Sequence, residues 1–272
     1  MKNALSFDVE DYFQVTGFED VVDRGRWDEY PVRFQIGLGK ILTILDRHDV
    51  KATFFFLGWI AERYPEAVAE VARRGHEVAV HGYAHRLVCR QQPDEFAADL
   101  ERALAAVRKA YAGPILGYRA PTFSIRADML WAFEVLKDLG FRYDSSILPV
   151  SRGRNGSADA QELPHEIAHG LLEFPLSTLR ICGRRLRVAG GGYLRLYPFA
   201  VTCQAIGWLN RRRGQPAIVY LHPWELDPEQ PRIWAGLGNT VRHRINLHRT
   251  ERRLEELCKR FEFAPVRKVL GL

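Results

Sequence analysis

The sequence has no long apolar run: no stretch of about 18 consecutive apolar residues occurs in its 272 residues. A membrane-spanning helix is therefore not expected. Cysteine is also scarce, with four residues that stand far apart and form no Cys-x-x-Cys pair: Cys89, Cys182, Cys203 and Cys258. That spacing argues against a zinc–thiolate site and favours free thiols in a reducing compartment.

The N-terminal sequence lacks the features that direct export. "MKNALSFDVED" carries one lysine and a very short apolar run, without the apolar core of a signal peptide. We therefore expect a cytoplasmic chain, unless an upstream segment has been removed. No nucleic-acid motif and no basic pattern interleaved with aromatic residues is present, so nucleic acid is not an expected partner.

Charge is distributed unevenly along the chain. Residues 1–150 hold 19 lysines and arginines against 22 aspartates and glutamates, whereas residues 151–272 hold 20 against 11. The basic half includes "NRRRG" at 210–214 and "RHRINLHRTERR" at 242–253. Such a half suits an anionic partner, either an acidic glycan or the inner face of a membrane, although a solvated helix face is the simpler interpretation.

Short apolar runs alternate with helix-period segments over residues 1–150. The runs predict buried strands at 4–7, 52–58, 76–82 and 115–121, and a short strand before "YDSSI" at 143–147. Helical spacing predicts helices at 36–48, 61–75 (beginning near Pro65), 93–113 and 127–140. Strands and helices that alternate with short connections predict an α/β protein with a parallel sheet or barrel.

The regular alternation ends after residue 150. Residues 151–166 are polar and predict a loop, and 171–178 and 185–198 predict strands around a glycine turn near a substrate mouth. A helix at 199–213 and a strand at 217–225 follow. Beyond a long loop, the sequence predicts a basic helix at 248–260 and a final strand at 264–270.

Candidate metal ligands lie at the ends of two predicted strands. His81 and His85 stand four residues apart in "HGYAH", a spacing that directs two imidazoles toward one divalent cation. "FDVED" adds three carboxylates, Asp8, Glu10 and Asp11. Two histidines and one carboxylate form a ligand set that leaves positions open for water and substrate, and the carboxyl ends of barrel strands are where such sites are built.

Five motifs together resemble a known family. "SFDVED", "HGYAH", "GYRAPTFS", "YDSSI" and "YLHPWE" have the order and spacing found in polysaccharide deacetylases, the NodB-homology domain of carbohydrate esterase family 4. The resemblance spans about residues 4–225. "AGGGYLRLYP" and "HPWELDPEQPR" are similar to the subgroup associated with exosortase and exopolysaccharide loci, which has a C-terminal extension of unassigned function.

The resemblance implies a fold, a cofactor and a reaction. The fold is a distorted (β/α)7-type barrel over residues 1–225, with an extension over 226–272 packed on it. The cofactor is a divalent metal, most simply zinc, with cobalt or nickel as alternatives. The reaction is hydrolysis of N-acetyl groups on an amino-sugar polysaccharide or its precursor in exopolysaccharide biosynthesis, with an acetylated glycan as the substrate.

The resemblance also implies residue roles. Asp8 resembles the general base that activates water, and Arg119 resembles the arginine that holds this base by paired hydrogen bonds. His222 resembles the general acid, and Asp144 the carboxylate that orients it. His81 and His85 resemble the metal ligands. The expected walls of the acetyl pocket are Tyr143, Leu221 and Trp224.

Two departures from the family pattern leave alternatives open. The usual adjacent aspartates are replaced by Asp-Val-Glu-Asp, so the third ligand is either Glu10 or Asp11; strand alternation favours Glu10, whereas a turn after Val9 favours Asp11. "YDSSI" lacks the tryptophan common in that motif. The alternative functions are hydrolysis of C–N bonds in a small ureide-like substrate, or glycan binding without catalysis.

Overall fold

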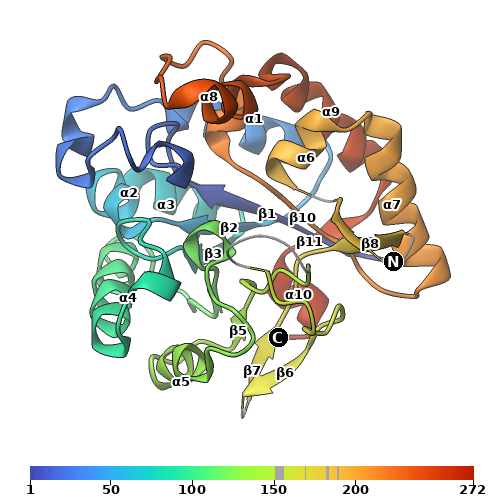
Figure 1. Ribbon diagram of the computed structural model, residues 1–272, viewed down its shortest axis with the longest axis horizontal. Coiled ribbons are helices and arrows are strands. Elements are labelled where there is room, and N and C mark those ends of the chain that lie inside the picture. Colours follow the sequence, from blue (N-terminus) through green and yellow to red (C-terminus); the bar gives the residue numbers. More distant parts are fainter. Residues whose placement is uncertain (151–155, 169, 182–183, 189) are drawn as a thin grey trace.

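The computed structural model describes residues 1–150, 156–168, 170–181, 184–188 and 190–272. Within them a curled sheet forms an incomplete barrel, in the order β10-β1-β2-β3-β4-β5-β7-β6 (Figure 1). All neighbouring pairs are parallel except β6 and β7. The strands are β1 (Asn3–Val9), β2 (Thr53–Phe56), β3 (Glu77–Val80), β4 (Gly117–Tyr118), β5 (Tyr143–Asp144), β6 (His165–Ala168), β7 (Leu171–Glu173) and β10 (Ile218–Leu221).

Helices cover the outer face of this sheet. They are α1 (Phe34–Arg47), α2 (Gly58–Arg63), α3 (Pro65–Arg73), α4 (Pro93–Arg108), α5 (Leu130–Asp138), α6 (Gly191–Leu196), α7 (Phe199–Arg212), α8 (Gly236–Arg244) and α9 (Thr250–Arg260). Short 3-10 turns join them: η1 (Thr16–Phe18), η2 (Arg24–Glu29), η3 (Val88–Arg90), η4 (Pro121–Phe123), η5 (Pro223–Leu226) and η6 (Leu247–Arg249). The small hairpin of β8 (Thr178–Ile181) and β9 (Arg184–Arg187) lies off the main sheet.

The sheet separates two hydrophobic clusters. Along β1, Leu5, Phe7 and Val9 face the helices and belong to the larger cluster, whereas Ala4 belongs to a smaller cluster inside the barrel. Side chains alternate between the faces of a strand, so the even-numbered positions of β1 point inward. Because both faces are covered, all seven residues of β1 are buried.

Local sequence explains where the long helix α4 begins and ends. Pro93 occupies its first turn, and Gln92 and Glu95 form a capping box that satisfies backbone N–H groups there. Acidic residues stand in the first turn and Arg108 in the last, which complements the helix dipole. The predicted alternation of strands and helices over residues 1–150 is confirmed by the element order. Most elements are shorter than expected, but β1 and α1 are longer, and the predicted helix at 61–75 is divided into α2 and α3.

The last residues of the chain close the bottom of the barrel. β11 (Phe263–Ala264) pairs with β1, and α10 (Val266–Leu270) follows at once. Val266 belongs to the inner cluster, and its backbone N–H donates to Thr53 Oγ1 at 2.8 Å. β11 and α10 therefore pack on the barrel; the division of the chain into a barrel at 1–225 and an extension at 226–272 stays a prediction.

Three predictions for the C-terminal half were wrong. Residues 264–270 form mostly helix α10 instead of a strand, because Pro265 provides an extended start and Val266 finds space inside the barrel. Residues 191–196 form α6, and the predicted long loop contains α8. Residues 151–155 of the predicted 151–166 loop lie outside the described residues, as does Cys182. Among the described residues, Cys203 and Cys258 form no disulfide.

No helix among the described residues has both the length and the apolar character needed to cross a bilayer.

Candidate metal and acid–base site

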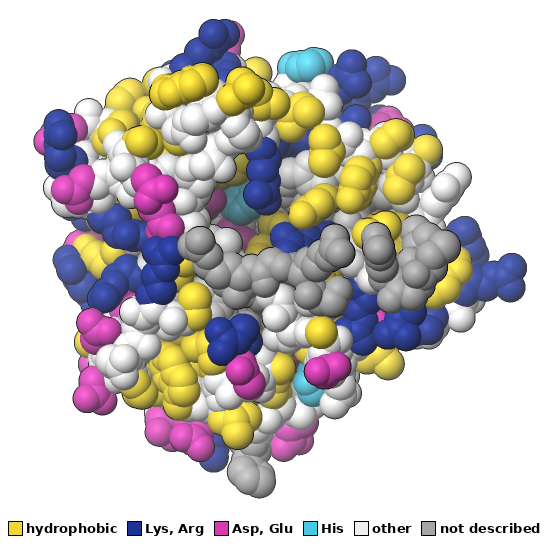
Figure 2. Space-filling model, viewed as in Figure 1, with side chains coloured by type: hydrophobic (Ala, Val, Ile, Leu, Met, Phe, Trp, Pro, Cys, Tyr) yellow, Lys and Arg dark blue, Asp and Glu magenta, His cyan; other side chains and the backbone are white. Residues whose placement is uncertain are grey.

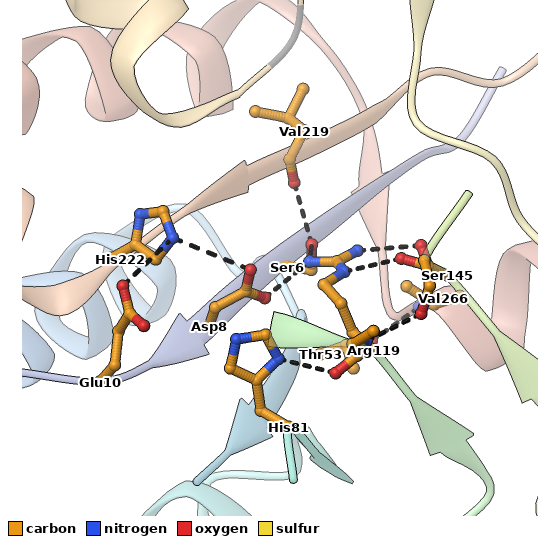
Figure 3. A network of polar contacts seen from close by, with 12 residues as sticks. Ser6, Asp8, Glu10, Thr53, His81, Arg119, Ser145, Val219, His222 and Val266 are labelled. Carbon is orange, nitrogen blue, oxygen red and sulfur yellow. Dashed lines mark hydrogen bonds and ion pairs between the residues drawn. The ribbon is translucent and has the colours of Figure 1, made fainter. Parts of the chain in front are cut away.

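The site lies at the carboxyl ends of the parallel strands. Ser6, Asp8 and Glu10 share the inward face of β1 and its end, because they are two residues apart. His81 directly follows β3, Arg119 follows β4, and His222 follows β10. Figure 3 shows these side chains converging from separate strands. The sheet register therefore brings together residues that are up to 214 positions apart in sequence.

Arg119 fixes Asp8 in a fully buried position. Its Nη1 donates to Asp8 Oδ1 at 2.7 Å and to Ser6 Oγ at 2.8 Å, and its Nη2 donates to Ser145 Oγ at 3.0 Å (Figure 3). The guanidinium also lies 4.2 Å from the ring centre of Phe55. The resemblance implied two hydrogen bonds from Arg119 to Asp8, but Arg119 makes one. Its other donors bind Ser6 of β1 and Ser145 after β5. Oδ2 of Asp8 is left facing the site.

Glu10, His81 and His85 form the candidate metal centre. One ligand atom from each lies within 4.8 Å of the others, and all three side chains are buried. His81 Nδ1 lies 2.8 Å from the carbonyl oxygen of Arg119. A proton donated from Nδ1 leaves Nε2 as a lone-pair donor for a cation. Burial lowers the pKa of His81 to about 4, so the ring is neutral at pH 7, as a ligand must be.

The residues present fit a divalent cation. Glu10 Oε2 lies 2.8 Å from His85 Nε2, but this buried oxygen has no hydrogen-bond partner. Such an arrangement is expected when the oxygen and the ring nitrogen both face one cation. Two imidazoles and one carboxylate suit zinc, cobalt or nickel. His85 is held with φ of 51°, an unusual backbone state for a non-glycine residue.

Asp11 lies outside this cluster and has a structural role. Its Oδ2 accepts from the backbone N–H groups of Arg33 at 2.6 Å and Phe34 at 2.9 Å, and its Oδ1 accepts from that of Tyr12 at 2.8 Å. It therefore anchors the start of α1. Burial raises the pKa of Asp11 to about 6, although these donors oppose the increase. The geometry favours Glu10 over Asp11 as the third ligand.

His222, at the end of β10, faces Glu10 and Asp8. Its Nε2 lies 3.6 Å from Glu10 Oε1 and 3.9 Å from Asp8 Oδ2. Its Nδ1 lies 2.7 Å from Oε1 of Glu225. Burial lowers the pKa of His222, but the carboxylates of Glu10, Glu225 and Asp8 more than offset it and raise the pKa to about 9. A cation bound by Glu10 would cancel part of that increase.

Residues 27–143 match the family described as polysaccharide deacetylase, and residues 145–271 match a domain of unknown function. The matched segment carries His81, His85 and Arg119, and its residues meet the ends of β1 and β10 in the structure. Over residues 27–143 the chain is therefore similar to the polysaccharide deacetylases.

Curated relatives agree with this assignment over part of their length. A peptidoglycan deacetylase-like protein of Gibberella zeae is 30% identical over 42% of this chain and 33% of its own length. A peptidoglycan-N-acetylglucosamine deacetylase of Bacillus cereus is 44% identical over 21% of each chain, and a peptidoglycan deacetylase of Helicobacter pylori is 28% identical over 42% and 38%. The matches thus span less than half of each of these relatives.

Solved structures share the fold. A Mycobacterium smegmatis protein assigned to the polysaccharide deacetylases has a TM-score of 0.66 at 20% identity, covering 99% of this chain and 90% of its own. A carbohydrate esterase family 4 pseudoenzyme from Bacillus anthracis has a TM-score of 0.53 at 15% identity, covering 99% and 65%. The distorted (β/α)7-type barrel expected from the sequence is confirmed.

Asp144 does not orient His222 in the deacetylase fold of this chain. It is completely buried at the end of β5, where Ser146 Oγ donates to it at 2.5 Å and the carboxyl of Glu173 contacts it. Burial raises the pKa of Asp144 to about 6 and that of Glu173 well above its ordinary value. The sequence prediction for Asp144 was therefore wrong, because the Nδ1 partner of His222 is Glu225.

The three expected pocket walls have different surroundings. Tyr143 lies inside the barrel, where its hydroxyl donates to Glu77 Oε1 at 3.0 Å. Leu221 faces the helices in the outer cluster. Neither lines the site. Trp224 does: its Nε1 donates to Glu10 Oε1 at 3.1 Å, and its ring stacks on His222 with centroids 5.3 Å apart.

A small pocket beside His222 supplies other walls. Its lining includes Phe123, Leu148, Val188, Gly190 and Tyr220. The ring of Tyr220 lies 5.7 Å from that of His222, and a Cβ on Gly191 would lie 3.5 Å from His222 Cε1. The glycine segment that the sequence placed near a substrate mouth therefore lies beside the general-acid candidate. Figure 2 shows a hollow near the middle of this face, with a histidine in it and hydrophobic side chains above.

Sequence reasoning missed Glu225 and Arg195. Arg195 Nε donates to Glu225 Oε2 at 2.5 Å, and both side chains are essentially inaccessible to solvent. The available signal was the spacing of His222 and Glu225 in "HPWE", since a glutamate three residues after a turn-starting residue can cap its backbone. The backbone N–H of His222 does donate to Glu225 Oε1 at 3.1 Å. Nothing local in the sequence indicated Arg195.

Proposed function

We propose that this protein is a metal-dependent hydrolase that removes N-acetyl groups from an amino-sugar polysaccharide or its precursor, in exopolysaccharide biosynthesis. The observation that carries the proposal is the Glu10–His81–His85 cluster with Asp8 and His222 on two sides of it. The polysaccharide deacetylase match over residues 27–143 supports the reaction class. The role in exopolysaccharide synthesis is supported by the resemblance of the C-terminal motifs.

Glu10, His81 and His85 hold the cation in this proposal. When bound, a divalent cation, most simply zinc, polarises the acetyl carbonyl and makes water more acidic. Trp224 and the carbonyl of Arg119 orient two of the ligands, through Glu10 Oε1 and His81 Nδ1. Such supporting hydrogen bonds fix ligand direction and tautomer.

Asp8 is the general base in this mechanism. Oδ1 is occupied by Arg119, so Oδ2, which faces His222 at 3.9 Å, accepts the proton of the attacking water. Arg119 holds the Asp8 carboxylate in place by a charge-assisted hydrogen bond in a buried setting. His222 donates a proton to the leaving nitrogen through Nε2. The two proton-transfer groups approach the cluster from the ends of the adjacent strands β1 and β10.

Glycan binding without catalysis is the second candidate, because one structural neighbour is a pseudoenzyme. The presence of all the ionisable groups that the mechanism needs favours catalysis. A ureide-like substrate would use the same groups and is distinguished by turnover of small cyclic amides.

The anionic partner suggested by the charge distribution is here an anionic membrane surface. Trp234, Leu237 and Val241 are exposed by 69%, 70% and 51%, and Arg232 and Arg242 are exposed beside them in sequence. Hydrophobic side chains line the upper edge of the face in Figure 2, above the hollow, where Figure 1 places α8. Apolar and basic residues together suit anionic lipid.

A vesicle experiment tests this surface. We expect the protein to cosediment with phosphatidylglycerol vesicles and to be released at high salt. Equal binding to neutral vesicles contradicts the proposal. The cytoplasmic location stays a prediction.

The decisive experiment compares the wild type with His81→Ala and Asp8→Asn. We measure metal per chain and the acetate released from tetra-N-acetylchitotetraose and from peptidoglycan fragments. The wild type and Asp8→Asn should bind one metal, His81→Ala should bind little, and both variants should lose acetate release by about 10²-fold or more. A metal-loaded wild type that binds these glycans but releases no acetate would support the pseudoenzyme reading instead.

A further inference from the structure

We propose that Glu225, held by Arg195, is the positioning residue that fixes His222 to protonate the leaving amine. This inference rests on the proposed deacetylase function and assigns a task to residues from the domain of unknown function, which covers 145–271. Glu225 does not touch the candidate metal centre. It acts through His222 alone.

Glu225 controls both the place and the direction of the His222 ring. Its Oε1 lies 2.7 Å from Nδ1 and accepts the backbone N–H of the same residue at 3.1 Å. A carboxylate can only accept, so the proton of the ring is retained on Nδ1 at this contact. Nε2 is then directed at the candidate metal centre, 3.6 Å from Glu10 Oε1. Trp224 stacks on the ring at an interplanar angle of 20° and prevents it from tilting.

Arg195 makes the buried carboxylate of Glu225 tolerable. Its Nε donates to Glu225 Oε2 at 2.5 Å, and its Nη1 donates to the carbonyl oxygens of His243 at 2.9 Å and Ile245 at 2.8 Å. The guanidinium thus connects α6, η5 and the end of α8. A buried ion pair costs desolvation and is stable only when its remaining donors and acceptors are satisfied. Here they are satisfied by a helix end, so the position of Glu225 is set by three segments.

The surroundings of Trp224 reinforce this arrangement. The ring of His243 also stacks on Trp224, with centroids 4.2 Å apart and an angle of 15°. Burial lowers the pKa of His243 to about 3, so its ring is neutral, and its Nε2 lies 2.8 Å from Gln230 Oε1. His222, Trp224 and His243 therefore form one stack whose outer end belongs to α8.

The proton transfer can be written with all atoms assigned. The oxygen of water bonds to the acetyl carbon, and its proton passes to Asp8. The C–N bond then breaks, its electron pair stays on nitrogen, and nitrogen takes the proton from Nε2 of His222. The products are the free amine and acetic acid, and the proton on Asp8 returns through solvent to His222. An amine is a poor leaving group without this proton, whereas a nitrophenolate leaves without one.

The test uses this difference in leaving groups. Glu225→Gln keeps the shape of the side chain, but Arg195 attracts the amide oxygen, so the amide N–H group meets Nδ1 and Nδ1 must accept. We expect kcat for acetate release from tetra-N-acetylchitotetraose to fall by about 10²–10⁴-fold, and the rate with 4-nitrophenyl acetate to fall by less than about tenfold. Equal losses on both substrates, with metal content unchanged, would overturn the inference.

A second measurement does not depend on activity. With ¹⁵N-labelled histidine, the zinc-loaded wild type should show a strongly downfield Nδ1–H proton assigned to His222, and Glu225→Gln should lack it. Persistence of that signal in the variant, or its absence in the wild type, contradicts the inference. The matched control is Glu162→Gln, which removes a carboxylate paired with Arg185 at 2.5 Å and should leave both readouts unchanged. A wild type that is inactive on every glycan but shows the signal refutes the proposed function and not the positioning.

Discussion

The base side and the acid side of the site are built in different ways. On the base side, Asp8, Glu10, His81 and Arg119 are delivered by neighbouring parallel strands, and their contacts follow from sheet register. On the acid side, His222 also follows a strand, but its orientation depends on Glu225 in a 3-10 turn and on Arg195 in a separate helix. The register of a regular sheet positions the first set, whereas a buried ion pair and an aromatic stack position His222.

The largest expected effect is on metal binding at the base side, where either Glu10 or Asp11 could be the third ligand. Glu10→Gln should lose most of the bound metal because an anionic oxygen aimed at the cluster is removed. Asp11→Asn should keep the metal but lose about 1–3 kcal/mol of unfolding free energy, because an amide cannot accept all three backbone N–H groups. Metal analysis and urea unfolding measure the two effects. If Asp11→Asn loses the metal and Glu10→Gln keeps it, Asp11 is the third ligand and Glu10 is not.

The next effect concerns the support of the acid side by α1. A Cβ on Gly37 would lie 1.8 Å from the carbonyl oxygen of Pro223, the residue after His222. Gly37→Ala must therefore displace η5 or α1, and we expect a loss of about 1–3 kcal/mol in unfolding free energy together with weaker amide hydrolysis. Gly39 in the same helix has nothing within 4 Å of its would-be Cβ, so Gly39→Ala should gain about 0.5–1 kcal/mol.

Urea unfolding of both glycine variants tests this contrast. If Gly37→Ala is as stable and as active as Gly39→Ala, close packing of α1 against η5 does not hold the acid side in place.

The smallest expected effect separates Asp144 from the acid side. Burial raises the folded-state pKa of Asp144 to about 6 and that of Glu173 well above its ordinary value, so the folded protein binds more protons than the unfolded chain above pH 4. Stability contributed by this pair is present below pH 4 and falls as pH rises through 6. In Glu173→Gln the free energy of unfolding should fall by about 1–3 kcal/mol less than in the wild type between pH 4 and 7.

Unfolding free energies of the two proteins at several pH values measure that difference. Parallel curves would show that Asp144 and Glu173 do not share a proton. If Glu173→Gln loses amide hydrolysis but keeps ester hydrolysis, Asp144 does influence protonation by His222.

Particular residues show how far sequence reasoning extends. The alternation of β1 predicted that Glu10 shares the face of Asp8, and the structure places both there, because a strand has a strict two-residue period. The expectation for Tyr143 and Leu221 came from their motif positions, and it was wrong. A motif position does not show which face of the sheet a side chain occupies, and the structure places Tyr143 in the inner cluster and Leu221 in the outer one. Residues 264–270 failed likewise, since an apolar run alone does not distinguish a strand from a short buried helix.

The sequence by itself determined the α/β alternation and the residues that meet at the carboxyl edge of the sheet, because these depend on local period and on strand ends; the barrel was implied by the family resemblance. Only the tertiary structure decided the partner of His222. Asp144 and Glu225 are both buried carboxylates within the five motifs, and only the fold shows that Glu225 is the one within hydrogen-bond distance of His222 Nδ1. Arg195 lies 30 residues from Glu225, and a buried charge is stable only where such a partner reaches it.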